Sequence, residues 1–169
     1  MFAAKSPLRV LGVKKRKISL WSLNLNSRHD RSLAIAAITL PDRSGIGYAA
    51  KGGQQTHNYT YSGSNTADDV AWYSENSGGK THEVGAKAPN ELGIYDMSGN
   101  VLEWCSDWYG STYPSGAIDP VGAASGSYRV YRGGGWHGNA TYAAVSNRTR
   151  NTPGLSYDNL GFRLACSSQ

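Results

Sequence analysis

The strand-like stretches of this chain are short, and long connections rich in glycine, proline and asparagine separate them. In "GNVLEWCSDWYG" the apolar residues Leu102, Trp104 and Trp108 alternate with polar or small ones, which predicts a strand with one buried face. The stretches "YRVYRGG" and "LGFRLAC" repeat the pattern and predict two further core strands. Connections such as "GSTYPSGAIDPVGAASGS" and "RNTPGLSYDN" are long for a compact domain, and loops of that length are usually functional or disordered.

Tryptophan favours order in these connections. Trp72, Trp104, Trp108 and Trp136 carry large apolar surfaces that can anchor loops to a small sheet. The chain has 169 residues, enough for one domain of ordinary size. Its 21 glycines and 11 tyrosines make a turn-rich mixture that is poor in the apolar stripes of long amphipathic helices. The sequence therefore predicts a single core built from short strands and long ordered loops.

Positive charge is confined to the beginning of the chain. Residues 1–45 carry nine Lys/Arg against two Asp, a net charge of +7, whereas residues 46–169 carry eight Lys/Arg against ten Asp/Glu, a net charge of −2. The densest run, Lys14 to Lys17, has the charge to contact nucleic acid or acidic lipid. Because no aromatic residue alternates with these charges as a stacking platform requires, we favour a solvated arm and do not expect a nucleic-acid partner.

No transmembrane segment is predicted, because no stretch approaches the roughly 18 apolar residues of a membrane span. The segment "ISLWSLNLNS", which follows the basic run, makes no convincing signal peptide, since serines and asparagines interrupt its apolar character. A cell-surface or secreted location and a cytoplasmic one both stay open.

Several ordered blocks of the chain resemble one known family. The blocks "NELGIYDMSGNVLEWCSDWYG", "DPVG", "YRVYRGGGW" and "GFRLA" occur in the order and spacing of the formylglycine-generating enzyme, or sulfatase-modifying factor, family, between about Tyr48 and Ala165. The resemblance implies an α+β, C-type-lectin-like fold, with a small twisted antiparallel sheet, long ordered loops and little helix. We expect residues 1–41 to be a basic segment without coherent periodicity, and residues 42–169 to form a truncated domain of this type.

One departure from the family pattern concerns a helix. "LPDRSGIGYAAKGG" matches the family's segment at both ends, but Gly45 and Gly47 replace good helix formers in its middle. Each glycine costs about 1 kcal/mol where a helix is intended, so we expect this helix to be weak.

Oxidase chemistry is not expected from this chain. The oxidase members of the family use a pair of cysteines after the R-G-G block to hold copper, and His137 to Asn151 contains no cysteine. A thiolate is the soft ligand that favours Cu(I), so metal capture and thiol chemistry are both lost without it. Cys105 and Cys166, the only cysteines of the chain, lie outside that segment and form either one pair or two inert thiols.

Other catalytic arrangements are also weak. His29, His57, His82 and His137 fall in separate segments, so we favour exposed loop histidines over a non-haem iron triad. Glu103 and Asp107 are four residues apart, too far along a strand to share a proton, and predict a polar strand face. The glycines of "RGGGW" lack the helix and lysine of a phosphate loop and predict a sharp backbone bend instead.

A structural calcium ion is the one cofactor that the resemblance implies. In the family, the G-N-x-x-E-W block contributes to a calcium site, and "GNVLEW" keeps Asn100 and Glu103, whose oxygens are of the kind that calcium prefers. The alternative is that Asn100 caps a turn and that Glu103 forms a hydrogen bond or a salt bridge.

The segment of residues 131–159 is rich in aromatic, amide and hydroxyl side chains, the composition of an antibody paratope. It also resembles the rewritten C-terminal repeat of the variable proteins of diversity-generating retroelements, which closes on G-F-R-L-A. The alternative is an unvarying loop surface. The candidate ligand-binding residues are Tyr131, Trp136, His137, Asn139, Thr141, Tyr142, Ser146, Asn147, Thr149, Arg150, Ser156, Tyr157 and Asp158.

The sequence thus favours a non-catalytic, receptor-like binding protein that displays residues 131–159 on a C-type lectin scaffold. Strands around Trp104, Val130 and Phe162 would hold the loops rigidly and limit the ordering cost of binding. The expected partner is a protein or a cell-surface glycan. The alternative function is that of a formylglycine-generating, sulfatase-modifying or related non-haem iron oxidoreductase.

Overall fold

The computed structural model describes residues 9–11, 38–111 and 122–166. The basic run Lys14 to Lys17, the segment "ISLWSLNLNS" and His29 lie outside these residues. The described elements, in chain order, are β1 (Arg9–Leu11), β2 (Ile38–Thr39), α1 (Arg43–Ala50), the 3-10 helix η1 (Gly53–Gln55), α2 (Ala67–Val70), β3 (Leu102–Trp108), β4 (Arg129–Arg132), α3 (Ala140–Ala143), β5 (Thr149–Asn151), β6 (Leu160–Phe162) and β7 (Leu164–Cys166).

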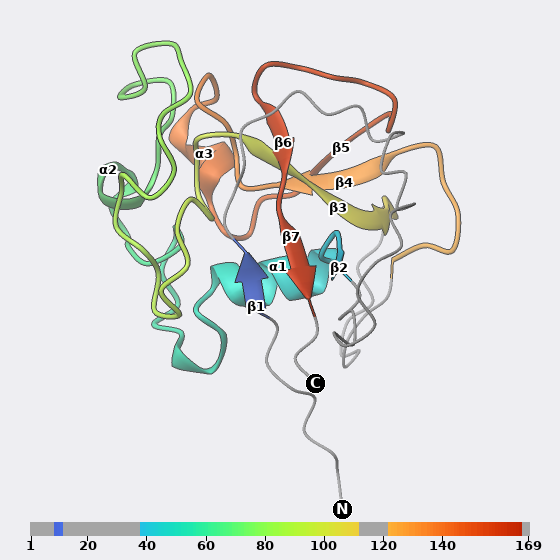
Figure 1. The fold of residues 1–169 in the computed structure, drawn as a ribbon, viewed down its shortest axis with the longest axis horizontal. Coiled ribbons are helices and arrows are strands. Elements are labelled where there is room, and N and C mark those ends of the chain that lie inside the picture. Colours follow the sequence, from blue (N-terminus) through green and yellow to red (C-terminus); the bar gives the residue numbers. More distant parts are fainter. Residues whose placement is uncertain (1–8, 12–37, 112–121, 167–169) are drawn as a thin grey trace, which may run out of the picture.

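The described strands form two small sheets (Figure 1). A four-stranded sheet has the order β5-β4-β3-β6, and it is antiparallel except for the parallel pair of β3 and β6. A three-stranded antiparallel sheet has the order β1-β7-β2. The predicted core strands around Trp104, Val130 and Phe162 are therefore neighbours in one sheet, since these residues belong to β3, β4 and β6.

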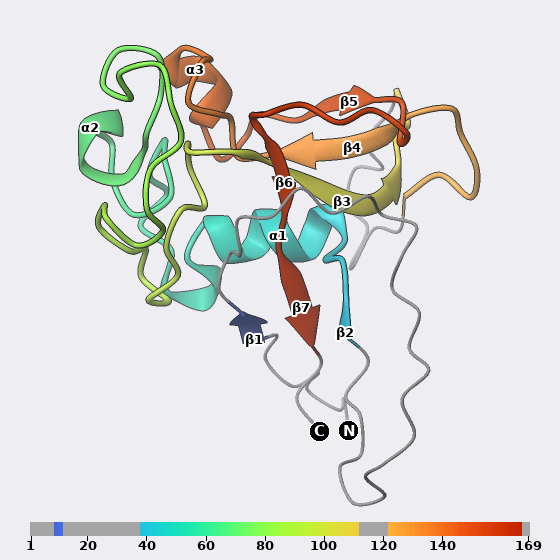
Figure 2. The same ribbon diagram turned by 45° about the horizontal axis from the view of Figure 1, so that its top comes forward.

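The two sheets are linked by the last part of the chain. β6 and β7 follow each other with only Arg163 between them, and in both ribbon views they run from the larger sheet into the smaller one (Figures 1 and 2). β7 lies between β1 and β2, so described strands from within residues 1–41 pair with the end of the domain. Part of the basic segment therefore belongs to the folded structure.

Helix α1 lies across one face of the four-stranded sheet, against β3 and β4 (Figure 2). The carboxylate of Asp42 caps its N-terminus by accepting from the backbone N–H of Gly45 at 2.5 Å. Arg43, which is 2% exposed, is held to Asp107 of β3: its backbone N–H donates to one carboxylate oxygen at 2.5 Å, and its Nε lies 3.7 Å from the other. The helix therefore forms although two glycines lie within it.

The prediction that Glu103 and Asp107 form a polar face of β3 is wrong, because this face is buried. Glu103, Cys105 and Asp107 are 2%, 1% and 6% exposed, whereas Leu102 and Trp108 are only half-buried. The face is buried because α1 packs against the strand and because each carboxylate has an arginine partner, Arg163 for Glu103 and Arg43 for Asp107. Buried carboxylates are tolerated when they are paired and hydrogen-bonded in this way.

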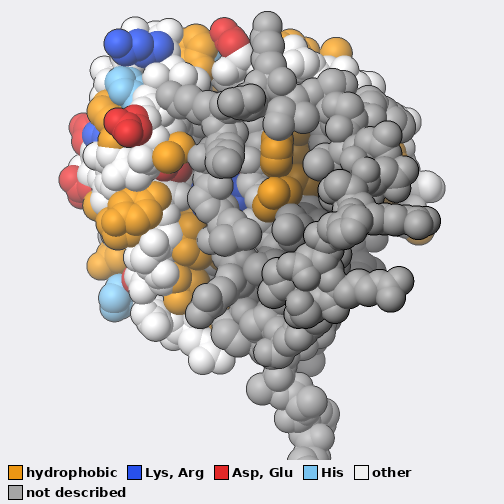
Figure 3. Space-filling view, in the orientation of Figure 1, with side chains coloured by type: hydrophobic (Ala, Val, Ile, Leu, Met, Phe, Trp, Pro, Cys, Tyr) orange, Lys and Arg blue, Asp and Glu red, His pale blue; other side chains and the backbone are white. Residues whose placement is uncertain are grey.

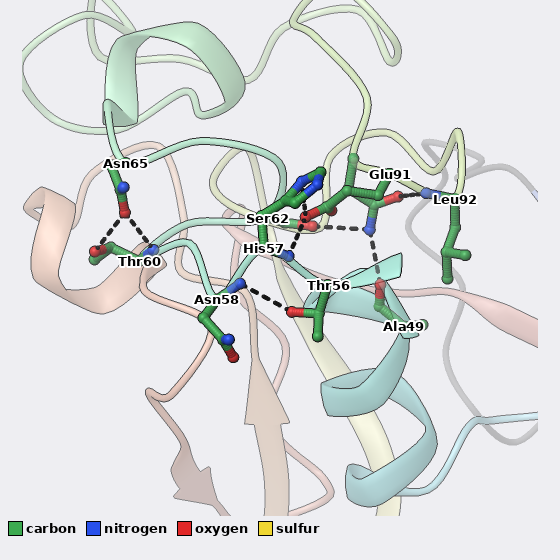
Figure 4. Close-up of polar contacts among 10 residues, drawn as sticks. Ala49, Thr56, His57, Asn58, Thr60, Ser62, Asn65, Glu91 and Leu92 are labelled. Atoms are coloured by element: carbon green, nitrogen blue, oxygen red, sulfur yellow. Dashed lines mark hydrogen bonds and ion pairs between the residues drawn. The ribbon is translucent and has the colours of Figure 1, made fainter. Parts of the chain in front are cut away.

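Residues 51–101 form ordered loops beside α1, together with the short helices η1 and α2 (Figure 1). Side-chain hydrogen bonds replace regular secondary structure there (Figure 4). The Asn65 carbonyl oxygen accepts from both the backbone N–H and the hydroxyl of Thr60, at 2.9 and 3.2 Å, and Glu91 accepts from the backbone N–H of His57 at 3.2 Å. The buried amide of Asn90 donates to the carbonyl of Ala49 at 2.7 Å and thereby fixes the loop on α1.

No helix within the described residues is long and apolar enough to cross a membrane.

Candidate ligand-binding site

A pocket of about 180 Å³ opens at the end of the sheet where β3 begins. Its walls come from β3, β4, β6 and the loops around residues 137 and 157, which the strand order brings side by side. The lining residues are Leu102, Tyr131, His137, Tyr157, Asn159 and Leu160. The structure therefore brings together three of the predicted ligand-binding residues from three separate parts of the segment of residues 131–159.

Residues of β3 contact the pocket residues Tyr131 and Asn159. The ring of Tyr131 packs edge-on against buried Trp104, with centroids 5.5 Å apart and an interplanar angle of 83°. Asn159 is 6% exposed, and its backbone carbonyl accepts from the N–H of Leu102 at 2.8 Å. Its side-chain amide nitrogen lies 2.8 Å from Nδ1 and 3.2 Å from Nε2 of His137, so the buried amide packs against the exposed imidazole.

The predicted glycine bend is confirmed and it sets the position of His137. Gly133 and Gly134 have φ angles of +91° and +71°, which favour glycine. A Cβ on Gly134 would lie 2.8 Å from the backbone of Ala143, so the bend also requires the absence of a side chain. The carbonyl of Trp136 accepts from the hydroxyl of Ser77 at 2.7 Å, which fastens the turn to the loop region.

The next predicted residues lie on and around α3. Asn139 caps this helix, and its side-chain oxygen accepts from the backbone N–H and the hydroxyl of Thr141 at 3.2 and 2.5 Å. Tyr142 is 51% exposed. Trp136 is half-buried, with its ring 5.4 Å from that of His137. Apart from His137, none of these side chains lines the pocket.

The remaining predicted residues are spread more widely. Asn147 is half-buried, and its backbone carbonyl accepts from Arg132 at 3.0 Å. Thr149 and Arg150 belong to β5. Ser146, Ser156 and Asp158 are exposed on loops. The structure does not bring these residues into the pocket, and the role predicted for all thirteen stays a prediction.

Three lining residues were not among the predicted ones, namely Leu102, Asn159 and Leu160. Leu102 and Leu160 begin two paired strands, which the sequence pattern predicts as scaffold. The nearest signal is the block "LGFRLA", because its first residue, Leu160, lies directly beside the end of the predicted segment.

The residues predicted as calcium ligands already have protein partners. Both oxygens of Glu103 accept from Arg163, at 2.8 Å each, and the pair is 3% and 2% exposed. The side-chain oxygen of Asn100, a residue with a φ of +65°, accepts from the backbone N–H of His82 at 3.0 Å. A calcium ion on Glu103 would have to displace the guanidinium of Arg163, and the oxygen of Asn100 is engaged by a loop 18 residues away, so the calcium site stays a prediction.

Cys105 has a free thiol that is 1% exposed. Burial raises the pKa of this thiol well above its usual value, and the nearby guanidinium of Arg132 opposes the shift only in part. A buried neutral thiol is inert as a metal ligand or a nucleophile. Cys166 belongs to β7, and its side chain lies outside the described part of the structure.

The described histidines have different surroundings. His57 is 65% exposed, with Nδ1 3.6 Å from the carboxylate of Glu91. His82 is half-buried and stacks on Trp72 with centroids 3.7 Å apart. Across the described residues, no three His, Cys, Asp or Glu side chains group as metal ligands.

Short strands in two small sheets, long ordered loops and few helical residues define an α+β, C-type-lectin-like fold, as the sequence predicts. The chain belongs to the sulfatase-modifying factor enzyme 1-like family, whose domain profile matches residues 16–168. The predicted family is therefore confirmed, and the match includes part of the basic segment of residues 1–41.

Solved and curated relatives support this assignment. The structure of Treponema denticola variable protein 1 is similar with a TM-score of 0.72 and 46% identity, over 78% of this chain and 48% of that one. Chaperone protein LppX of Paenibacillus barcinonensis is 41% identical over a 116-residue alignment that covers 59% of this chain and 38% of the relative. The formylglycine-generating enzyme of Streptomyces coelicolor is 43% identical over 90 residues, 50% of this chain and 29% of the enzyme. The chain spans less than half the length of each of these relatives.

Proposed function

We propose that this chain is a non-catalytic ligand-binding protein that uses the C-type-lectin-like scaffold to present residues 131–159 to a protein or a cell-surface glycan. The observation that carries the proposal is the convergence of Tyr131, His137 and Tyr157 on one pocket. Tyrosine and histidine present an apolar body with a polar tip, so such a pocket can both cover and hydrogen-bond part of a ligand.

The rigidity of the pocket supports the proposal. The ring of Tyr131 packs against buried Trp104, and the imidazole of His137 packs against the side chain of buried Asn159. A preorganised site loses little conformational freedom on binding, which is the property expected of a display surface. The similarity to a variable protein at 46% identity points in the same direction.

A selection experiment tests the proposal. The purified chain is used to select binders from a random peptide phage library and to probe a glycan array, with Tyr157→Ala and His137→Ala as pocket variants and Tyr48→Ala as the control. Tyr48 is 56% exposed on α1 and does not line the pocket, so the control removes a comparable ring elsewhere. We expect selected ligands to lose roughly tenfold or more in affinity with the pocket variants, as for central interface residues, and to bind Tyr48→Ala normally. Ligands that bind all variants equally would contradict the proposal.

Comparison of natural isolates tests whether the surface varies. We expect substitutions to concentrate within residues 131–159, in codons derived from adenine-containing template positions, while the glycines of "RGGGW" inside this segment and the "LGFRLA" block after it stay constant. An even spread of substitutions along the domain would favour an unvarying loop surface.

The alternative proposal is an enzyme of the formylglycine-generating or related non-haem iron type, and the 43% identity to the Streptomyces coelicolor enzyme favours it. The absence of cysteine between residues 137 and 151 argues against copper-thiolate chemistry. Stoichiometric copper or iron in the purified protein, together with oxygen uptake in the presence of a cysteine-containing peptide, would favour the enzyme over the binding protein.

A further inference from the structure

Arginine and aromatic side chains gather at the end of the four-stranded sheet opposite the pocket. This arginine patch consists of Trp108, Tyr109, Tyr128, Arg129, Arg148 and Arg150. Leu102 at the pocket and Trp108 at the patch are the two ends of β3, about 20 Å apart for a strand of this length. The patch is therefore separate from the pocket, although Arg148 and Arg150 belong to the display segment of residues 131–159 and the inference rests in that part on the proposed function.

The contacts within the patch hold its guanidinium groups over aromatic rings. The Cζ atom of Arg129 lies 3.7 Å from the ring centroid of Trp108, and that of Arg150 lies 4.3 Å from Tyr109 and 5.5 Å from Tyr128. Such cation–π contacts fix the position of a long side chain without using its N–H groups, and Arg129 in addition donates to the backbone carbonyl of Ser106. Arg150 is exposed and Tyr128 is 44% exposed, so the patch reaches solvent.

Positive charge is concentrated in the arginine patch, although residues 46–169 as a whole are not basic. Residues 46–169 carry a net charge of −2, and they contain five arginines. Arg132 and Arg163 donate to groups inside the domain. The other three arginines lie in the patch, where Arg129 also donates to the backbone carbonyl of Ser106 and Arg148 to that of Ser111. Neither Arg129 nor Arg150 pairs with a carboxylate of a described residue.

Exposed acidic side chains lie elsewhere in the described structure. Asp68 and Asp69 are exposed on α2. Figure 3 shows acidic side chains at the left of the view, with Lys or Arg side chains beside them at the upper left. None of the residues of the patch is acidic, so an acidic partner would be attracted to its three arginines.

The chemistry of the patch favours a carboxylate-bearing protein partner. The rings of Trp108 and Tyr109 are covered by arginines of this chain, so they offer no free platform for stacked nucleobases. Guanidinium groups match carboxylates by paired hydrogen bonds, and arginine, tyrosine and tryptophan are the residues enriched at the centres of protein interfaces. We infer that the arginine patch docks a protein segment rich in aspartate or glutamate.

Binding of a labelled acidic peptide tests this inference on the whole chain. The probe is a fluorescein-labelled peptide of alternating glutamate and glycine, and its counterpart has glutamine in place of glutamate. Fluorescence anisotropy at low salt should show binding of the glutamate peptide only, and binding should weaken as salt is added, because exposed charges are screened.

The variants locate the binding on the patch. We expect Arg150→Gln to lower the affinity for the glutamate peptide roughly three- to tenfold. Arg150→Lys should lower this affinity less, because the charge is kept. Lys80→Gln removes the same charge from an exposed residue outside the patch and should leave affinity unchanged within about twofold.

Four outcomes would overturn the inference. They are equal binding of the glutamate and glutamine peptides, unchanged affinity in Arg150→Gln, an equal loss in Lys80→Gln, and tighter binding of oligothymidine or a heparin-derived oligosaccharide than of the glutamate peptide. The first three would mean that the arginines of the patch contact solvent and bind no acidic protein segment. The last would mean that the patch binds another class of polyanion.

Discussion

Replacing Glu103 by glutamine tests how strongly the fold depends on the charge that this residue shares with Arg163. The two side chains are 3% and 2% exposed, and two guanidinium nitrogens donate to the two carboxylate oxygens at 2.8 Å. Glu103→Gln keeps the shape of the side chain and one acceptor oxygen, but it leaves a buried guanidinium without a counter-charge. Breaking a buried pair in this way costs about 3–5 kcal/mol. Arg163 also donates to the carbonyls of Tyr95 and Asp96 at 3.1 Å, so we expect the lower end, about 3 kcal/mol.

Urea unfolding followed by tryptophan fluorescence measures this loss, since Trp104 is buried in the same strand as Glu103. Glu103→Gln, Arg163→Met and the double variant form a cycle, and the double variant should lose at least about 1 kcal/mol less than the sum of the single losses. In a domain of this size the single losses correspond to a fall in Tm of about 6–12 °C. Glu83→Gln, at an exposed glutamate, is the matched control and should change stability by less than about 0.5 kcal/mol. A loss below about 1 kcal/mol in Glu103→Gln, with additive single losses, would refute the reasoning.

Three further predictions concern the bend, the buried thiol and calcium. Gly134→Ala should lower the free energy of unfolding in urea by roughly 2 kcal/mol or more, because φ is +71° and the new Cβ would lie 2.8 Å from the backbone of Ala143; an equal loss in Gly154→Ala, where the space is open, would contradict this. Burial raises the pKa of Cys105, so the folded chain keeps a proton that the unfolded chain releases above its own pKa of about 8.5. The thiol's contribution to stability is therefore complete below that pH and is lost as pH rises, so the free energy of unfolding should fall more steeply at alkaline pH in the wild type than in Cys105→Ala; parallel curves would speak against it. Because Arg163 takes both oxygens of Glu103, neither EDTA nor added Ca²⁺ should move the Tm in differential scanning fluorimetry, and a calcium-dependent rise of several degrees would restore the calcium site.

Features with a local cause were predictable from the sequence. The alternation around Trp104 and Val130 marks strands because side chains on a strand point to alternate faces. The bend at Gly133 and Gly134 follows from the backbone freedom of glycine.

The buried face of β3 was not predictable in this way. Glu103 and Asp107 read as a polar face because local pattern treats carboxylates as solvent-facing. Their partners Arg163 and Arg43 lie 60 and 64 residues away along the chain. Only the tertiary structure brings these charges together, and no periodicity encodes that pairing.

Helix α1 shows the same limit of local reasoning. Gly45 and Gly47 lower its intrinsic helix propensity, yet Asp42 caps it and Arg43 ties it to β3. A Cβ at Gly47 would make ordinary van der Waals contact with the guanidinium of Arg132 at 3.5 Å, so packing against Arg132 does not require a glycine there. Long-range contacts thus stabilise a helix that the sequence alone marks as weak.

The candidate pocket was predictable only in its polar part. Composition singled out Tyr131, His137 and Tyr157, but Leu102 and Leu160 enter the pocket because the parallel pairing of β3 and β6 sets them opposite each other. Sequence composition contains no information about which apolar strand ends face a ligand.

The position of β7 between β1 and β2 constrains how the chain acquires its structure. Leu11 is paired with Leu164, and Thr39 with Ala165. Both strand pairings of this small sheet therefore join residues that are more than a hundred positions apart in the sequence. During synthesis, strands β1 and β2 emerge from the ribosome long before their shared neighbour exists. Until then they carry unsatisfied backbone edges of the kind that pair with other chains. Chaperone protection or rapid translation of the intervening segment should therefore raise the yield of native protein more than stabilising the four-stranded sheet does.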